Sequence, residues 1–224
     1  MGQKVMVSTL TKEETREAIL DAADHLLARY GYRKMTVDDI AQEAGIGKGT
    51  IYLHFASKEE VTLSHVDRIV ERLKERLWAI ARTDADVAIR LRLMLVARVL
   101  FRFDSVQHYT QSLNDLLAAL RPNLLARRAR YFEDEARVFA EVLGEGARAG
   151  VFDAGDALST AFALLHATNS LLPYSLSTTE LGERDEIKEK TEHIADLILS
   201  GLLRKHDAPD TTATATRPPP RRRR

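Results

Sequence analysis

Four side chains that donate hydrogen bonds stand within the seven residues from Lys48 to His54, and their types suit contacts with phosphate oxygens. They are Lys48, Thr50, Tyr52 and His54. If the segment is helical, Lys48 lies at its start, where the ammonium adds its charge to free backbone N–H groups and to the positive end of the helix dipole. The short hydroxyl of Thr50 suits a phosphate or a base edge. The segment is therefore a candidate for binding a phosphate backbone.

The remaining residues of the segment divide into an anchoring face and an open face. At about 100° per residue, Ile51 and Phe55 share one side of the helix and are expected to fix it to a core. Gly49 allows another backbone to approach closely. Leu53 either touches a thymine methyl group or is an ordinary exposed leucine, and the sequence leaves both interpretations open.

The elements that must position this segment are helices. Thr11 and Glu14 have the spacing of a capping box at the start of a first helix. Gly31 is placed to close that helix in a left-handed conformation. Thr36 is the expected N-cap of a second, short helix that stops at Gly45.

A tight turn, Gly45–Gly47, then leads into the third short helix, Lys48–Phe55. Ser57 and Glu60 form a further capping-box pattern, followed by a long amphipathic helix that ends at about Ala81. Two short helices joined by a glycine-containing turn have the geometry of a DNA-reading helix-turn-helix, in which the second helix enters the major groove.

The run from Thr36 to Glu59, TVDDIAQEAGIGKGTIYLHFASKE, resembles the signature of TetR-family repressors. The resemblance extends over roughly residues 12 to 65 and combines a recognition helix, its core anchors and the next helix cap. It implies that Thr36, Tyr52, His54 and Lys58 contact phosphates, and that Lys48, Gly49, Thr50 and Leu53 lie nearest the bases. For His54, a packed or merely exposed histidine is the alternative. Gly47 departs from the pattern, because many relatives have serine there.

The rest of the chain has helical patterning, so an all-α fold is expected. The predicted segments are 86–103, 106–120, 123–149, 156–177 and 185–205, with Pro122 separating the second from the third. The expected organisation is an N-terminal helix-turn-helix DNA-binding domain over 1–57, a helical ligand-binding and dimerisation domain over 58–206, and a disordered Pro/Arg-rich tail over 207–224.

The resemblance also implies three partners. The last two helices, 156–177 and 185–205, are expected to form a homodimer with their copies. Two recognition helices would then lie about one DNA turn, ~34 Å, or a multiple apart, so the target is double-stranded DNA with a short palindromic operator. A small-molecule effector is expected among the helices of 86–177, where its binding would move the helix over 58–81.

Candidate ligand residues combine aromatic, charged and polar side chains. For each of them an ordinary core or surface role is the alternative. Arg98 and Arg102 are the most informative, because they fall on an apolar helical stripe where a charge needs a partner, either an acidic ligand group or a protein carboxylate. The candidates are Arg98, Phe101, Arg102, His108, Asn114, Phe132, His166 and Asn169.

Composition argues against several other classes of protein. The chain has 224 residues, no cysteine and a formal net charge of zero, so disulfides, thiolate metal sites and a bulk polycation are excluded, and a cytoplasmic location is expected. The longest apolar stretches are interrupted by charged or polar residues and are too short to span a membrane. An enzyme finds little support, because there is no metal-spaced His-Glu pair, phosphate loop or nucleophile elbow. No cofactor or metal is expected. A family member that answers to a protein partner, or to nothing, remains an alternative.

Overall fold

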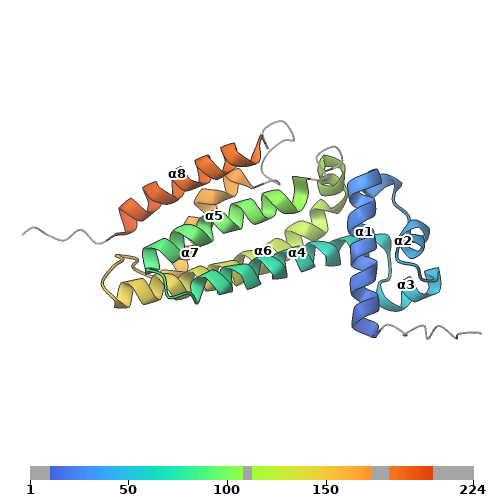
Figure 1. The fold of residues 1–224 in the computed structure, drawn as a ribbon, viewed down its shortest axis with the longest axis horizontal. Helices are drawn as coiled ribbons and strands as arrows, with labels where there is room; N and C mark the ends of the chain where they lie inside the picture. The colour runs from blue at the N-terminus through green and yellow to red at the C-terminus, as the bar shows by residue number, and fades with distance from the viewer. Residues whose placement is uncertain (1–10, 108–112, 173–181, 204–224) are drawn as a thin grey trace, which may run out of the picture.

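The computed structural model describes residues 11–107, 113–172 and 182–203, and within that part the chain is almost entirely helical (Figure 1). The only other regular pairing there is an isolated antiparallel bridge between Phe152 and Leu203. The helices are α1 (Lys12–Lys34), α2 (Val37–Glu43), α3 (Lys48–His54), α4 (Lys58–Ala81), α5 (Val87–Val106), α6 (Leu113–Arg148), α7 (Ala157–Thr168) with the 3₁₀ turn η2 (Asn169–Leu171), and α8 (Arg184–Leu202). The expected all-α fold is confirmed.

Helices α1 to α3 form a head at one end of the molecule (Figure 1). Their starts are fixed by side chains, as the sequence predicts: Thr11 and Thr36 each complete a capping box, and Ser57 accepts a hydrogen bond from the backbone N–H of Glu60 at the start of α4. Gly45 turns the chain between α2 and α3 with φ of +68°, a value that favours glycine.

One prediction for α1 is corrected. Gly31 has a positive φ of 74°, but its ψ of 166° is extended and outside the left-handed helical region. The chain therefore kinks at Gly31 and resumes as one more helical turn, which ends at Lys34, with Met35 as C-cap. The fully buried side chain of Met35 holds this turn to the head core.

Helices α4 to α8 form an elongated body beside the head, and α4 and α6 run along each other for much of its length (Figure 1). The main core of the body is a cluster of apolar side chains to which all five helices contribute, and a smaller cluster around Val99, Phe103 and Ile187 joins α5 to α8. The fully or almost fully buried members of the main core include Leu73, Leu77, Leu91, Met94, Leu95, Phe139, Leu143, Phe152, Leu165 and Ala195.

The predicted break at Pro122 is wrong, since α6 continues through it as one helix of 36 residues. A proline inside a helix removes one backbone hydrogen bond and costs about 3 kcal/mol. Leu116 and Leu120 before the proline are buried in the head core, and Leu124 after it packs against the same cluster. Burial of these three leucines on one face of the helix outweighs the cost of the proline. This burial depends on tertiary contacts, so the local sequence signals did not predict it.

The body ends differ from the predicted ranges as well. The α-helix of the predicted segment 156–177 stops at Thr168 and tightens into η2, and residues 173–181 lie outside the described part of the chain. The final helix closely matches its prediction, at Arg184–Leu202 for a predicted 185–205. The predicted tail over 207–224 also lies outside the described residues.

A polar cluster joins α1 of the head to α4 of the body. Arg68 of α4 donates to Glu17 at 2.9 Å and to Asp21 at 2.7 Å, both on α1. A guanidinium can only donate, so Nδ1 of the neighbouring His65, 3.2 Å from Arg68, must accept. The proton of the neutral ring is then on Nε2, which faces Asp24 of α1 at 3.5 Å. The cluster therefore holds His65 as a neutral bridge between head and body.

The packing of α6 against Phe152 gives a first prediction. A Cβ atom added at Gly146 would lie 2.2 Å from the ring of Phe152, which is itself buried, whereas one added at Gly144 would meet only the flexible end of Arg148 at 3.4 Å. We expect Gly146→Ala to lower the free energy of unfolding by about 1–3 kcal/mol through overpacking. Gly144→Ala should raise it by up to about 1 kcal/mol. Urea unfolding measures both, and equal effects would contradict this packing.

A second prediction concerns pH. Burial lowers the pKa of His65 from 6.5 to about 4, with the nearby Asp24 carboxylate partly opposing this effect. As the pH falls below 6.5 the unfolded chain takes up a proton at this residue before the folded protein does, so stability falls by up to about 1.4 kcal/mol per pH unit. We expect His65 to contribute a loss of roughly 2 kcal/mol between pH 7 and pH 5.

The measurement is the free energy of unfolding of the wild type and of His65→Gln at several pH values in that window. The variant should have a flatter profile, because glutamine does not titrate. His193→Gln, at an exposed position on α8, is the control and should follow the wild type. Parallel profiles for the wild type and His65→Gln would refute the role assigned to His65.

Candidate nucleic-acid interface and cavity

The outward face of α3 is the first candidate site. Ile51 is completely buried and Phe55, its C-cap, is almost so, which confirms the expected anchoring face. The next two residues point to solvent: Tyr52 is 52% exposed and Leu53 is 80% exposed. Figure 1 shows α3 on the outer side of the head, with α1 between it and the body. An aromatic and an aliphatic side chain are thus presented side by side on a small helix that is firmly fixed from behind.

Lys48 and Gly49 lie exposed at the start of α3, and the amine of Lys48 is held by α2. Its Nζ donates to the carboxylate of Asp38 at 2.8 Å, and this hydrogen bond raises the pKa of Lys48 above its ordinary value. The residue is therefore a cation at neutral pH. Because the pair is exposed, solvent screens it and it contributes little to stability, so a phosphate can compete for the amine.

Two of the residues predicted to contact phosphates, Thr36 and Lys58, also make hydrogen bonds within the fold. The hydroxyl of Thr36 donates to Asp39 at 2.7 Å and accepts from its backbone N–H at 3.1 Å. The amine of Lys58 donates to the carbonyls of Tyr32 and Met35, both at 2.9 Å, and lies 4.4 Å from the centre of the Tyr32 ring. Lys58 thereby joins the start of α4 to the end of α1. Contacts of these two residues with DNA stay a prediction.

The other two residues on this surface have fewer constraints. Thr50 is half-buried on the first turn of α3, and His54 is half-buried at its end, with its ring 6.3 Å from that of Phe55. The fold thus brings the eight predicted DNA-contacting residues to one region of the head, from the N-caps of α2 and α3 to the start of α4. Their individual roles in binding are not tested by this arrangement.

The two arginines among the predicted ligand residues, Arg98 and Arg102, meet in the interior of the body. Arg98 is completely buried, and each nitrogen of its guanidinium has an acceptor: Nε donates to Glu135 at 2.7 Å, and the terminal nitrogens donate to Thr168 at 2.8 Å and Asn169 at 2.9 Å. Its charge is thus satisfied by the protein carboxylate that the sequence left as one alternative. Arg102 also donates to Glu135, through the other carboxylate oxygen.

The pKa of Glu135 reflects both effects of this environment. Burial raises it, but the positive charges of Arg102 and Arg98 outweigh burial, so the pKa lies below the ordinary value and the carboxylate is ionised at neutral pH. Three ionised groups thus meet in the interior, two positive and one negative. Arg98 alone balances the charge of Glu135, which leaves the charge of Arg102 in excess.

The aromatic candidates also lie near this cluster. Phe132 stacks on Phe162 with ring centres 6.0 Å apart. The ring of His166 lies edge-on to the ring of Phe132, with their centres 4.8 Å apart. Phe101 is half-buried against the body core. The side chains of the remaining two candidates, His108 and Asn114, lie outside the described residues.

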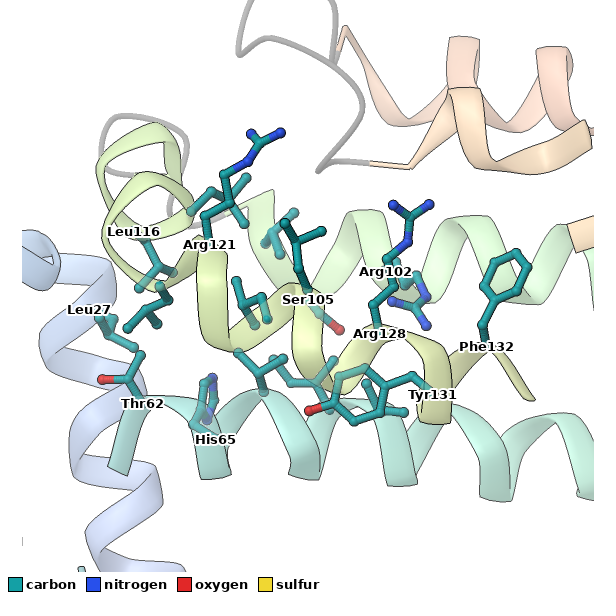
Figure 2. Close-up of a pocket in the computed structure, with 18 of the residues that line it drawn as sticks. Leu27, Thr62, His65, Arg102, Ser105, Leu116, Arg121, Arg128, Tyr131 and Phe132 are labelled. Carbon is teal, nitrogen blue, oxygen red and sulfur yellow. The ribbon is translucent and has the colours of Figure 1, made fainter. Parts of the chain in front are cut away.

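A cavity of about 270 Å³ lies between α4, α5 and α6, and α1 closes one end of it through Leu27 (Figure 2). Of the predicted ligand residues, Arg102 and Phe132 line it. Its polar lining residues are Thr62, His65, Arg102, Ser105, Arg121, Arg128, Tyr131 and Glu135. Its apolar walls are formed by Leu27, Val66, Ile69, Val70, Val106, Leu116, Leu117, Leu120, Leu124, Leu125 and Phe132.

The sequence missed most of these residues for a simple reason. The cavity draws on α1, α4 and both halves of α6, and no local pattern indicates that these helices meet. In the sequence, Arg128 stands among other arginines with the pattern of a solvated helix face, and Leu27 lies on the apolar stripe of the first helix. Only the length of α6, running unbroken past Pro122, brings Arg121 and Arg128 to the cavity that Leu27 closes.

The described residues contain neither a membrane-spanning helix nor a cluster of metal-binding side chains. None of the helices there is long and apolar enough to cross a membrane. No group of three or more histidine, cysteine, aspartate or glutamate side chains in that part of the chain is arranged to hold a metal ion.

Comparison with known proteins places these features in context. The profile of the family described as "Bacterial regulatory proteins, tetR family" matches residues 19–64, which contain α2, α3 and most of α1. The transcriptional activator FasR of Mycolicibacterium smegmatis is 35% identical over 102 residues, which are 46% of this chain and 45% of FasR. The chain therefore spans less than half the length of that relative.

Two longer matches cover the body as well. The transcriptional repressor KstR2 of Mycobacterium tuberculosis is 30% identical over 143 residues, 61% of this chain and 68% of KstR2. A crystal structure of a TetR/AcrR-family regulator from Thermobifida fusca superposes with a TM-score of 0.59 and 30% identity, covering 83% of this chain and 97% of that one. With the anchored helix-turn-helix and the helical body, these matches show that the chain belongs to the TetR family of bacterial regulatory proteins.

Proposed function

We propose that this protein is a sequence-specific DNA-binding transcription regulator, a repressor that binds an inverted-repeat operator as a homodimer and is released by a small molecule. The observation that carries the DNA-binding part is the presentation of Tyr52 and Leu53 on α3, fixed from behind by the buried Ile51. These side chains stand on the open face of the second helix of a helix-turn-helix, where Tyr52 suits a phosphate and Leu53 suits a thymine methyl group.

The charge of the head limits how binding can work. Residues 1–60 contain 8 lysines and arginines against 10 aspartates and glutamates, a net charge of −2, so bulk attraction to DNA is weak. Affinity must come from a few placed donors, among them Lys48 and Tyr52, and from binding two half-sites at once. A monomer is therefore expected to bind poorly.

The dimer that supplies this avidity is proposed to use α7 and α8. Both helices bury one face in the body and leave small or apolar residues open on another. On α8, Leu197 is 61% exposed next to the half-buried Ile198, and on α7 the small residues Ala163 and Ala167 are exposed. Small residues let two helices approach closely, and a self-complementary face of this kind suits a two-fold dimer.

Release by an effector is proposed to start at the cavity. It is bounded by α4 and closed by Leu27 of α1, so its contents contact both the body and the head. A ligand that fills it favours the arrangement of α1 and α4 in which it fits best, and this arrangement sets the spacing of the two copies of α3. Both an activator and a repressor are among the related proteins. The repressor assignment rests on the likeness to KstR2.

A third prediction tests the DNA-binding face. Tyr52→Ala and Lys48→Ala should each weaken binding to a DNA fragment from the regulated promoter by tenfold or more, or about 1.4 kcal/mol, because each dimer loses two contacts. Lys48→Ala should also reduce the slope of log affinity against log salt by about two, one phosphate contact per subunit. Electrophoretic mobility shift at several salt concentrations measures both effects.

Matched controls are available for both variants. Tyr30 of α1 is 46% exposed and is not among the predicted DNA-contacting residues, and Lys74 of α4 is held by Glu71 at 2.8 Å much as Lys48 is held by Asp38. Tyr30→Ala and Lys74→Ala should leave affinity and salt slope unchanged. If the α3 variants bind as tightly as these controls, the mapped surface is wrong.

A fourth prediction tests the dimer. Leu197→Glu places a charge in the proposed interface, so light scattering should show the mass shifting from dimer toward monomer, and operator affinity should fall by at least tenfold. Ala79→Glu, at an exposed position on α4, adds the same charge elsewhere and should do neither. A Leu197→Glu protein that remains a dimer with full affinity would place the interface on another surface.

A further inference from the structure

The cavity between head and body has an uneven distribution of charge, and this distribution indicates what it binds. Three arginines line it, Arg102, Arg121 and Arg128, against one carboxylate, Glu135. The pKa of His65, lowered to about 4, keeps that side chain neutral. Glu135 is paired with the buried Arg98, so the groups that line this space carry more positive than negative charge, and its walls are otherwise mostly leucine and valine.

Arg102 is the centre of this excess. Glu135 is already neutralised by the fully buried Arg98, so the single hydrogen bond that Arg102 makes to Glu135 does not balance its charge. The Nε–H of Arg102 is also buried without an acceptor in the described part of the chain. A buried donor left unpaired is unfavourable, so an acceptor that enters the cavity beside it gains affinity. Two other arginines, Arg68 and Arg90, share this feature, but neither lines the cavity.

The two ends of the cavity differ in chemistry. Figure 2 shows Arg102, Arg128 and Phe132 toward one end and Leu27, Thr62 and Leu116 toward the other. At that second end the hydroxyl of Thr62 already donates its hydrogen bond to the backbone carbonyl of Lys58. Arg121 lies beside Leu116 in the same view, nearer to this second end. The two ends therefore differ in that Arg102 and Arg128 stand together at one, whereas leucine side chains form most of the wall at the other.

We propose that this cavity binds a single-chain amphiphile with an anionic carboxylate head, which lies against Arg102 and Arg128 while its hydrocarbon tail runs toward Leu27. This proposal rests on the proposed function in one respect, because it takes the amphiphile to be the effector of the regulator. The volume of about 270 Å³ limits the size of the tail. A water-sized group occupies about 30 Å³ of liquid, so the cavity holds roughly nine such groups, which suits a chain of medium length.

The pairing of head and tail explains why neither half alone should bind. A carboxylate satisfies the free Nε–H of Arg102 and the excess charge, and a charged hydrogen bond of this kind is stronger than a neutral one. The tail removes the apolar walls and its own methylene groups from water, so each added methylene that fits the cavity strengthens binding. An alkyl chain with a cationic head would bring a like charge against the arginines.

The test uses decanoate as the probe, measured by isothermal titration calorimetry on the full chain without DNA. We expect decanoate to bind, and decanol and decylamine to bind at least tenfold more weakly. Acetate, which has the head without the tail, should show no binding at the same concentrations. Decylamine binding as tightly as decanoate, or no binding of decanoate at millimolar concentration, would overturn the proposal.

Variants locate the head group. Arg102→Gln should weaken decanoate binding at least tenfold, and Arg128→Gln, at an exposed position, should weaken it severalfold. Arg137→Gln is the matched control, because Arg137 lies exposed on α6, held by Glu133 at 2.6 Å, and does not line the cavity. If all three variants bind decanoate like the wild type, the arginines do not hold the head group.

The experiment separates this proposal from the function on which it rests. Calorimetry without DNA reports the cavity alone, and mobility shift without decanoate reports DNA binding alone. Decanoate that binds and also releases the DNA fragment supports both. DNA binding that is intact in a protein to which decanoate does not bind removes only the proposed ligand class.

Discussion

Two helices, α4 and α6, each pack into the head core and into the main core of the body, and the rest of the structure depends on this sharing. Val61 and Leu63 of α4 belong to the head core, whereas Leu73 and Leu77 of the same helix belong to the body core. The first turns of α6 likewise pack against the head while its second half fills the body. Side chains in a close-packed core resist displacement, so a shift of either helix in the body must be felt in the head.

The cavity lies where this coupling is strongest. Its walls come from the stretches of α4 and α6 between the two cores, and α1 closes one end. Beside it, Arg68 and His65 tie α4 to α1 through exposed and half-buried carboxylates that can exchange partners. The head is therefore held to the body by apolar contacts at its centre and by polar contacts at its rim.

The buried polar cluster around Arg98 serves a different purpose from the hydrophobic core. It joins α5 to α6 through Glu135 and to the end of α7 through Thr168 and Asn169. Removing one partner of a buried ion pair is strongly destabilising because the other charge is left unpaired, so these helices keep a definite register. The same cluster faces the cavity through Arg102, and it thus links the cavity wall to one of the two helices of the proposed dimer interface.

The sequence by itself determined what depends on neighbours in the chain. Helix starts at Thr11, Thr36 and Ser57, the turn at Gly45 and the buried face of α3 all follow from contacts within four residues, and each was predicted. Only the tertiary structure decided the course of α6 through Pro122, the pairing of Arg98 with Glu135, and the cavity. Each of these depends on residues 37 or more positions apart, or on burial that outweighs a local signal, and no local pattern contains that information.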